Sequence, residues 1–166
     1  MVVVLTGVSG TGKTTIGRIL AERLRCRFLD ADDYHPAANV AKMSAGIAFE
    51  DADRWPWLES LNVELRAAEA RGECAVLACS ALKHAYRERL AAGLTRCRFA
   101  FLRGSPELIA RRVAARQHRY MPASLLHSQF AALEAPANAI VVDVEAPVET
   151  CVDVLARALG ASSPRP

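Results

Sequence analysis

The sequence predicts a single α/β domain built on a five-stranded parallel sheet that helices cover on both faces. The length of 166 residues suits one domain. Five short apolar runs alternate along the chain with segments of helical periodicity. Each run is apolar almost throughout, which is typical of parallel strands buried on both faces. We expect residues 1–161 to form the domain and residues 162–166, which contain only Ser, Pro and Arg, to form a frayed tail.

The first expected elements are a strand, a helix and a second strand. Residues 2–6 are rich in β-branched side chains and too few for a helix, whereas residues 13–25 repeat Ile and Leu at helical spacing. Residues 27–30 form the second expected strand and lead into an acidic cluster. We expect residues 35–57 to be irregular, because His35-Pro36 and Trp55-Pro56 interrupt any helical pattern there.

The later elements continue the alternation of strand and helix. A leucine-bearing helix begins near Leu58 and stops at Gly72, and Ser105 with Pro106 has the pattern of a helix N-terminus. The remaining expected strands are 75–79, 98–102 and 140–144, and the remaining expected helices are 83–92, one that Pro106 begins, one that Pro122 begins, and 147–159.

Composition excludes several classes of protein. Lys and Arg total 21 and Asp and Glu total 18, so the net charge of +3 requires neither nucleic acid nor a membrane surface as a partner. No apolar run approaches the roughly 20 residues of a membrane helix, and we do not expect the first residues to form a signal peptide. The five cysteines lack metal-ligand spacing, so we expect reduced core thiols in a cytoplasmic protein.

A glycine-rich segment after the first strand has the full pattern G-x-x-x-x-G-K-[ST]. Its glycines allow backbone N–H groups to turn inward toward phosphate oxygens, and the following helix directs its positive dipole end to the same place. Lys13 is expected to reach the β- and γ-phosphates, and the Thr14 hydroxyl to ligate Mg²⁺. The expected ATP-binding residues are Gly7, Val8, Ser9, Gly10, Thr11, Gly12, Lys13, Thr14 and Thr15.

The acids of this chain narrow the class of nucleotide-binding protein. The third strand ends without the carboxylate of a motor or AAA-type ATPase, and no NKxD guanine signature follows. Asp30 and Asp32 instead follow the second strand, two residues apart and on the same side of an extended segment. We expect Asp32 to accept a proton from an attacking hydroxyl and Asp30 to hold Mg²⁺ through water. The alternative is a solvated loop or a helix N-cap.

Four arginines precede Met121-Pro122, at positions 111, 112, 116 and 119. Arg112 and Arg116 are four residues apart and therefore share a helix face. Phosphoryl transfer develops charge on the transferring oxygens, so we expect a lid at about residues 112–124 whose Arg112 and Arg116 bind ATP and whose Arg116 is catalytic. The alternative is a solvated helix face in an arginine-rich chain.

Three further segments resemble the gluconokinase family. Residues 29–58 are similar to its block D-x-D-x-x-H-P…N-x-x-K-M…G-x-P-L-x-D-x-D-R-x-P-W-L, and residues 79–87 to its C-S-A-L-K-x-x-Y-R. Residues 128–134 match S-Q-F-x-x-L-E. With the glycine-rich loop, the resemblance extends to about residue 144. It implies the fold of shikimate and nucleoside monophosphate kinases, and ATP-dependent phosphorylation of D-gluconate at the 6-hydroxyl.

The resemblance also implies roles for single residues. Asp32 would be the base, His35 and Arg54 would line the sugar-acid pocket, and Lys83 and Arg87 would contact the substrate carboxylate or phosphate. A small acid with several hydroxyls needs a cation and several hydrogen-bond partners. For Asn39, Lys42 and the pair Trp55 and Trp57, packing onto the core is an equally good explanation.

The chain departs from the family pattern before Pro122, where His118-Arg119-Tyr120 replaces G-H-F. Two alternatives therefore stay open: a kinase of the same fold for another small sugar acid or polyol, and a nucleotide-binding module without transfer activity. The expected partner is the small-molecule substrate, with neither nucleic acid nor membrane, and the family is compatible with a homodimer.

Overall fold

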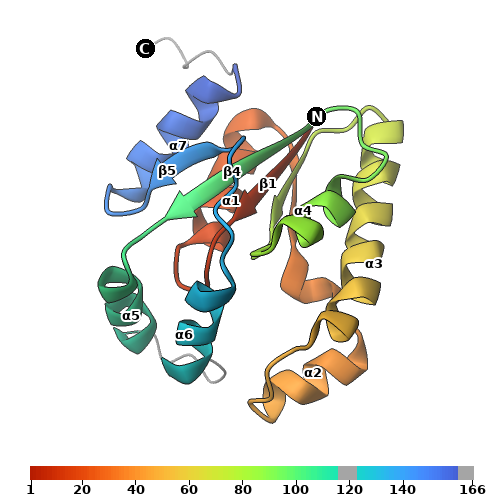
Figure 1. Cartoon of the computed structure of the whole chain (residues 1–166). Helices are drawn as coiled ribbons and strands as arrows, with labels where there is room; N and C mark the ends of the chain where they lie inside the picture. Colours follow the sequence, from red (N-terminus) through yellow and green to blue (C-terminus); the bar gives the residue numbers. More distant parts are fainter. Residues whose placement is uncertain (116–122, 161–166) are drawn as a thin grey trace.

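A computed structural model describes residues 1–115 and 123–160 and confirms the five-stranded parallel sheet flanked by helices (Figure 1). The strands are β1 (Val2–Thr6), β2 (Arg27–Asp30), β3 (Ala75–Ala78), β4 (Cys97–Arg103) and β5 (Ile140–Asp143). The helices are α1 (Lys13–Leu24), the 3-10 turn η1 (Ala31–Tyr34), α2 (Ala37–Ser44), α3 (Asp51–Ala70), α4 (His84–Ala91), α5 (Pro106–Ala115), α6 (Ala123–Ala132) and α7 (Val148–Ala158). In the described ranges, no helix is long and apolar enough to cross a membrane.

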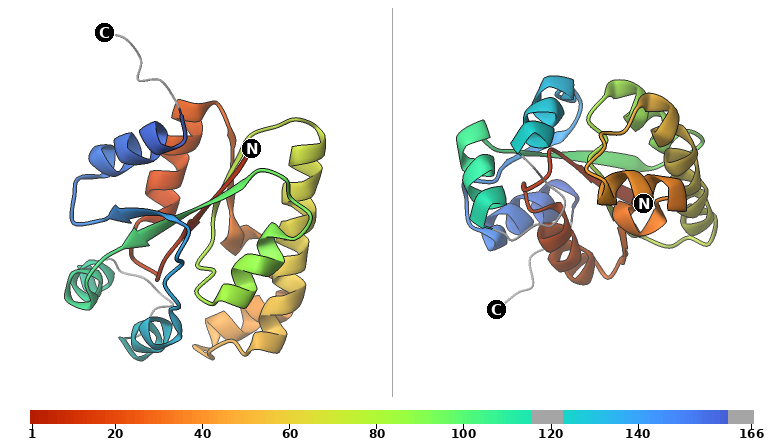
Figure 2. Two further views of the ribbon diagram at one scale, coloured as in Figure 1. Left: turned by 45° about the horizontal axis from the view of Figure 1, so that its top comes forward. Right: turned by 90° about the horizontal axis from the view of Figure 1, so that it is seen from below.

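The sheet has the order β2-β3-β1-β4-β5, and every neighbouring pair is parallel. Helices α1 and α7 cover one face, and α3 and α4 cover the other (Figure 2). The connection after β1 therefore leads to one face and the connection after β3 to the other. In such sheets, the crevice between two strands whose connections diverge is where ligands bind, at the carboxyl ends of the strands.

The core alternates along β1, as the two-residue period of a strand requires. Val3 and Leu5 pack under α1 and α7, whereas Val2 and Val4 pack under α3 and α4. All four side chains are fully buried. The apolar composition of this strand follows from burial on both faces.

The segment expected to be irregular is largely helical, so that expectation is wrong. Helix α2 occupies residues 37–44, and α3 begins at Asp51 and continues through Pro56. A capping box formed by Glu50 and Asp53 fixes the start of α3, and the buried Trp57 holds the helix against the core just after the proline. Pro56 lies in the second turn of α3, where it removes one backbone donor, and the capping box and the burial of Trp57 offset this loss.

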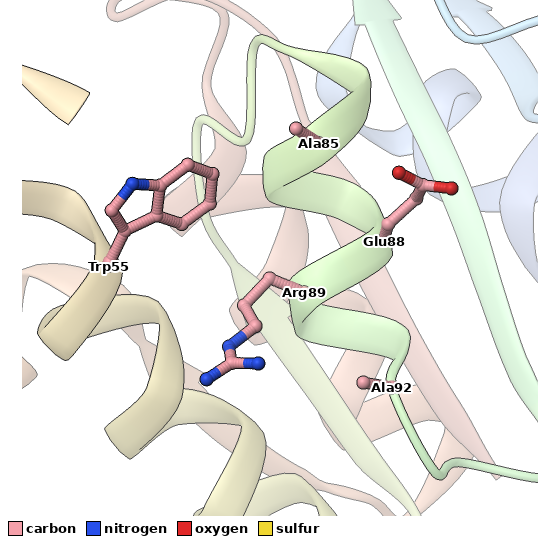
Figure 3. A pocket seen from close by; sticks show the side chains of 5 residues that line it. All are labelled: Trp55, Ala85, Glu88, Arg89 and Ala92. Atoms are coloured by element: carbon pink, nitrogen blue, oxygen red, sulfur yellow. The ribbon is translucent and has the colours of Figure 1, made fainter. Parts of the chain in front are cut away.

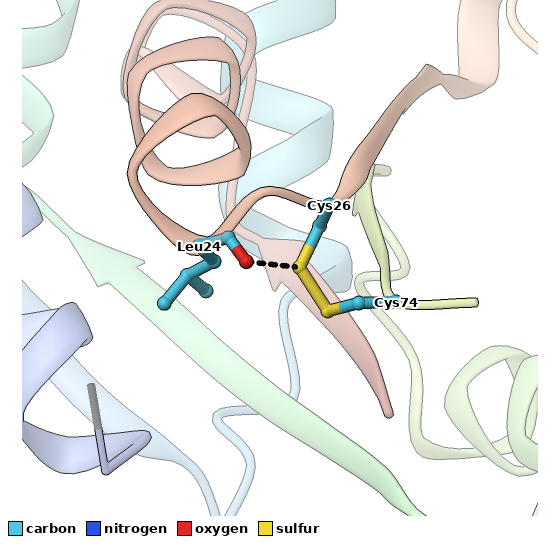
Figure 4. Close-up of a disulfide and its surroundings, with 3 residues drawn as sticks. All are labelled: Leu24, Cys26 and Cys74. Atoms are coloured by element: carbon cyan, nitrogen blue, oxygen red, sulfur yellow. Dashed lines mark hydrogen bonds between the residues drawn. A yellow bond between two sulfur atoms is a disulfide. The ribbon is translucent and has the colours of Figure 1, made fainter. Parts of the chain in front are cut away.

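Cys26 and Cys74 form a disulfide, so the expectation of five reduced thiols is wrong for this pair (Figure 4). The two residues stand immediately before β2 and β3, whose first residues, Arg27 and Ala75, are paired in the sheet. This register brings their Cα atoms to 4.6 Å. The pairing of these strands, and not the spacing of the cysteines, therefore decides which two can join. Cys79, Cys97 and Cys151 remain free thiols.

Candidate active site

A cavity of about 630 Å³ lies at the carboxyl ends of the strands, where the glycine-rich loop after β1 meets the loop after β3. Among the described residues, its lining contains Ser9, Gly10, Gly12, Lys13, Thr14, Thr15, Asp30, Asp32, His35, Arg54 and Lys83 of the expected site. In Figure 1, helices α2, α5 and α6 lie beyond these strand ends. The fold thus collects the phosphate loop, the acidic pair and two substrate-side cations around one space.

The phosphate loop has the backbone shape that its glycines allow. Gly10 and Gly12 have φ of 89° and 92°, and Gly12 is the N-cap of α1. The ammonium of Lys13 donates hydrogen bonds to the carbonyl oxygens of Gly7 and Val8, at 2.9 and 3.0 Å. Burial lowers the pKa of Lys13, and the charges of Asp32 and Asp30 oppose that shift. A buried ammonium at a helix N-terminus makes this corner favourable for an anion.

Thr14 and Asp30, the two residues expected to hold a metal, are in direct contact. The Thr14 hydroxyl donates to Asp30 Oδ2 at 2.9 Å, and the backbone N–H of Asp32 donates to Asp30 Oδ1 at 3.2 Å. Asp30 is therefore also the N-cap of η1, which was the structural alternative for this residue. In the described part of the chain, no group of three or more His, Cys, Asp or Glu side chains is placed to hold a metal. One hydroxyl and one carboxylate suit Mg²⁺, which keeps several waters and phosphate oxygens as its other ligands.

Asp32 faces the cavity beside a buried imidazole. Its Oδ1 lies 3.8 Å from Nε2 of His35, whose ring stacks on the indole of Trp57 at a centroid distance of 4.3 Å. The interaction with His35 lowers the pKa of Asp32, and the charge of Lys13 adds to this effect. The carboxylate is therefore ionised at neutral pH, and an ionised carboxylate can accept a proton.

Asp51 is a site residue that the sequence-based expectations omit. Its carboxylate accepts hydrogen bonds from Lys83 Nζ at 2.8 and 2.9 Å, and from the hydroxyl of Tyr86. Both hydrogen bonds lower the pKa of Asp51, and the one from Lys83 has the larger effect. Arg54 stands over the rings of Phe49 and Tyr86. Lys83 thus has a carboxylate partner within the protein, and the signal for it was the acid at position 51 inside the block shared with the family.

Comparisons with known proteins agree with this geometry. A family model described as an AAA domain matches residues 2–139, which include the phosphate loop and four of the strands. A gluconokinase from Arabidopsis thaliana is 41% identical over 177 aligned positions, which cover 95% of this chain and 94% of that protein. The chain belongs to the gluconokinase family.

Solved structures extend the comparison to the fold. A gluconokinase from Sinorhizobium meliloti superposes with a TM-score of 0.83 at 38% identity, over 94% of this chain and 91% of that one. A shikimate kinase from Bacteroides thetaiotaomicron superposes with a TM-score of 0.68 at 19% identity, over 96% and 98%, and so shares the fold. The expected family and the expected fold are both confirmed.

Two expected ligand-binding arginines have other contacts in this gluconokinase-family chain. The buried Arg87 donates to the carbonyl oxygens of Ala81 and Leu82, at 3.0 and 2.9 Å. Ala81 has a φ of 39°, so Arg87 supports the irregular loop after β3 and does not line the cavity. Arg112 donates to Val144 O at 2.6 Å beyond β5, also outside the cavity lining.

Of the other residues singled out in the sequence, some pack in or around α3 and the rest lie outside the described residues. Lys42 pairs with Asp53 at 2.7 Å, and the buried Asn39 donates to Asp53 O, so both organise the start of α3 in this family block. Trp57 is buried, donates to Ala31 O and also lines the cavity. Arg116, the changed segment 118–120, much of the expected lid and the tail 162–166 lie outside the described residues.

A second hollow of about 480 Å³ lies away from the active-site cavity, between α3 and α4 (Figure 3). Trp55 of α3 faces helix α4 there, and Ala85, Glu88, Arg89 and Ala92 complete its lining. Arg89 forms an ion pair with Glu59. The indole of Trp55 also contacts the ring of Tyr86 edge-on, so its role in the family motif is to pack α3 against α4.

Proposed function

We propose that this chain is an ATP-dependent gluconokinase that phosphorylates the 6-hydroxyl of D-gluconate. The observation that carries the proposal is the position of Asp32. Its ionised carboxylate faces one cavity that has a phosphate loop on one side and the cation Arg54 with the Asp51–Lys83–Tyr86 cluster on the other. A phosphoryl donor and a hydroxy acid can therefore meet beside a proton acceptor.

In the proposed reaction, the 6-hydroxyl oxygen forms a bond to the γ-phosphorus while Asp32 accepts the hydroxyl proton. The bond from the γ-phosphorus to the bridging oxygen breaks, and ADP leaves with that electron pair. Lys13 and the backbone N–H groups at the start of α1 stabilise the charge on the phosphate oxygens. Arg116 stays a prediction for the same role, since it lies outside the described residues.

We propose Mg²⁺ as the metal, held by the Thr14 hydroxyl and, through water, by Asp30. The 2.9 Å contact between Thr14 Oγ1 and Asp30 Oδ2 supports this, because both oxygens are hard donors at one edge of the phosphate loop. When bound, Mg²⁺ supplies neutralisation of phosphate charge.

On the acceptor side, we assign the substrate carboxylate to Arg54 and not to Lys83. The Lys83 ammonium is paired directly with Asp51, whereas Arg54 donates to the carbonyl oxygen of Phe49 and interacts with the charges of Asp51 and Asp53 only at longer range, so its guanidinium is the better placed of the two for an anion. The oxygens of Asp51 and the hydroxyl of Tyr86 are suited to substrate hydroxyl groups. His35 has one ring nitrogen beside Asp32 and the other beside the side-chain amide of Asn39, so its role here is to position Asp32.

The deciding experiment measures ADP release with ATP, Mg²⁺ and one acceptor at a time. We expect release with D-gluconate and little release with shikimate, AMP or water. Stronger release with another sugar acid or polyol would identify the same-fold alternative. The absence of release with every acceptor, while ATP still binds, would identify a non-catalytic nucleotide-binding module and contradict the proposal. We further propose a cytoplasmic location, where ATP is available and where the Cys26–Cys74 pair would be kept reduced. Measurement of the molecular size in solution tests for a homodimer.

A further inference from the structure

Two consecutive residues at the tip of the phosphate loop are contacted by different helices. A Cβ atom on Gly10 would lie 2.8 Å from Val113 Cγ2 and 3.1 Å from Ile109 Cγ2, so α5 packs directly on this glycine. Ser9 is contacted from α6, which carries Gln129. Among the described residues, these contacts connect the tip of the phosphate loop to α5 and α6, in addition to β1 and α1, which the loop joins.

The contact between Ser9 and Gln129 has two hydrogen bonds and joins residues 120 positions apart. The backbone N–H of Ser9 donates to Gln129 Oε1 at 2.7 Å, and Gln129 Nε2 donates to Ser9 Oγ at 3.1 Å. A primary amide can make this pair because it has one acceptor and one donor side by side. Gln129 also lines the cavity, so the pair forms part of the wall of the nucleotide site.

The chain just after Gln129 is anchored to the loop that follows β3. Glu134 N donates to Leu82 O at 3.0 Å, and the Glu134 carboxylate accepts from the backbone N–H of His84 at the start of α4. Gln129 and Glu134 both fall in the motif S-Q-F-x-x-L-E, to which no role has yet been given. The anchor at Glu134 limits the freedom of the segment that presents Gln129 to the phosphate loop.

We propose that Gln129 is a positioning residue that acts through Ser9 to hold the phosphate loop in its nucleotide-binding shape. A loop that is in its binding shape for only a fraction of the time has an affinity reduced in proportion to that fraction. The proposal concerns nucleotide affinity. It rests on the proposed kinase function only for the identity of the nucleotide as ATP.

The test measures binding of a non-hydrolysable ATP analogue by calorimetry in Gln129→Met, which keeps the length of the side chain and removes both hydrogen-bonding atoms. Loss of two neutral hydrogen bonds predicts roughly a tenfold higher Kd. The Kd for gluconate alone should stay close to that of the wild type, and the melting temperature should fall by no more than a few degrees, as expected for the loss of two hydrogen bonds. The matched control is His127→Ala on the exposed part of α6, for which the Kd should not change.

A second variant shows whether Gln129 acts through Ser9. Ser9→Ala removes one of the two hydrogen bonds and should raise the Kd by a smaller factor. Combining Ser9→Ala with Gln129→Met should then weaken binding less than the product of the two single effects. If Gln129→Met does not fold, two other measurements test the proposal. Ser9→Ala must bind the ATP analogue more weakly than the wild type, and the backbone amide of Ser9 in the wild type must be protected from hydrogen exchange.

Wild-type affinity in Gln129→Met, or independent effects in the combined variant, would overturn the inference. Equal losses of nucleotide and gluconate binding would also overturn it, because they would indicate a general structural role. Absence of ADP release in the wild type would contradict the proposed function and leave these binding measurements fully interpretable, so the two failures are distinguishable.

Discussion

Asp30 and Asp32 are two residues apart and have the same side chain, yet their neighbours give them different chemistry. Asp30 accepts hydrogen bonds from the Thr14 hydroxyl and the Asp32 N–H, which directs it to the phosphate loop. Asp32 lies beside His35, which lowers its pKa, and faces the cavity. A carboxylate whose pKa is lowered stays ionised as the pH falls toward its ordinary titration range. The local contacts therefore separate a metal-side acid from a proton acceptor.

Replacement of Asp32 by Asn tests this separation. The amide cannot accept the proton of the attacking hydroxyl, so we expect kcat to fall by about 10²- to 10⁴-fold. The Kd for ATP should change little, because the phosphate loop keeps its contacts. Steady-state kinetics and calorimetry measure the two quantities. Asp33→Asn, which changes an exposed neighbouring acid, is the control and should keep the wild-type rate. A wild-type kcat in Asp32→Asn would exclude Asp32 as the base.

Among the secondary-structure elements, the ends of β2 and β3 show how pairing outside the site supports the site. The Cys26–Cys74 disulfide joins the starting ends of these strands, and the acidic pair and the loop around Ala81 follow their other ends. That loop contains a non-glycine residue at positive φ, and the buried Arg87 holds it by two hydrogen bonds. Strand pairing sets the distance between the two loops, and Arg87 sets the shape of one of them.

The disulfide predicts a thiol count and a difference in stability. Protein unfolded without reductant should show three reactive thiols, those of Cys79, Cys97 and Cys151, and five after reduction. Reduction opens a loop with a sequence separation of 48 and should lower the free energy of unfolding by about 2–4 kcal/mol. Urea titration with and without reductant measures the change. Five thiols before reduction would show that the bond does not form.

In the folded protein, the thiols should react slowly. Burial raises the pKa of Cys79 to about 12 and that of Cys97 to about 11, so almost no thiolate is present near pH 8. The number of thiols must therefore be measured in the unfolded protein. The folded protein is the control, and its thiols should react much more slowly.

At the scale of the whole molecule, the cavity joins the two covered faces of the sheet. Helix α1 begins on the phosphate loop and packs on one face, whereas α3 and α4 carry Arg54, Asp51 and Tyr86 and pack on the other. The proposed nucleotide site is thus supported by one core and the proposed sugar-acid site by the other. Binding should therefore stabilise the folded chain as a unit.

A thermal unfolding experiment measures this stabilisation. An ATP analogue at about 100 times its Kd should add about 2.7 kcal/mol to the free energy of unfolding and raise the melting temperature. Gluconate should add a further increase, because its contacts are on the other side of the cavity. Lys13→Met should lose most of the nucleotide-dependent increase and keep that from gluconate. Equal increases in the wild type and in Lys13→Met would contradict the placement of the nucleotide.

The features of this protein that are set by residues close together in the sequence could be predicted from the sequence. The five strands, the phosphate loop, the order of the helices and the pair Asp30 and Asp32 all follow from spacings of a few residues, because strand, turn and helix geometry are local. The helices within residues 35–57 were missed, because a capping box and a buried tryptophan outweigh a proline in the second turn of α3.

Contacts between distant residues were decided by the tertiary structure. Spacing does not show that Asp51 neutralises Lys83, that Cys26 joins Cys74 or that Gln129 holds Ser9. Each of these pairs lies where the sheet order β2-β3-β1-β4-β5 brings together segments that precede or follow the strands. The sequence by itself determined which chemical groups this gluconokinase-family chain has, and the strand order determined which of those groups face each other across the cavity, because that order brings together loops that are far apart along the chain.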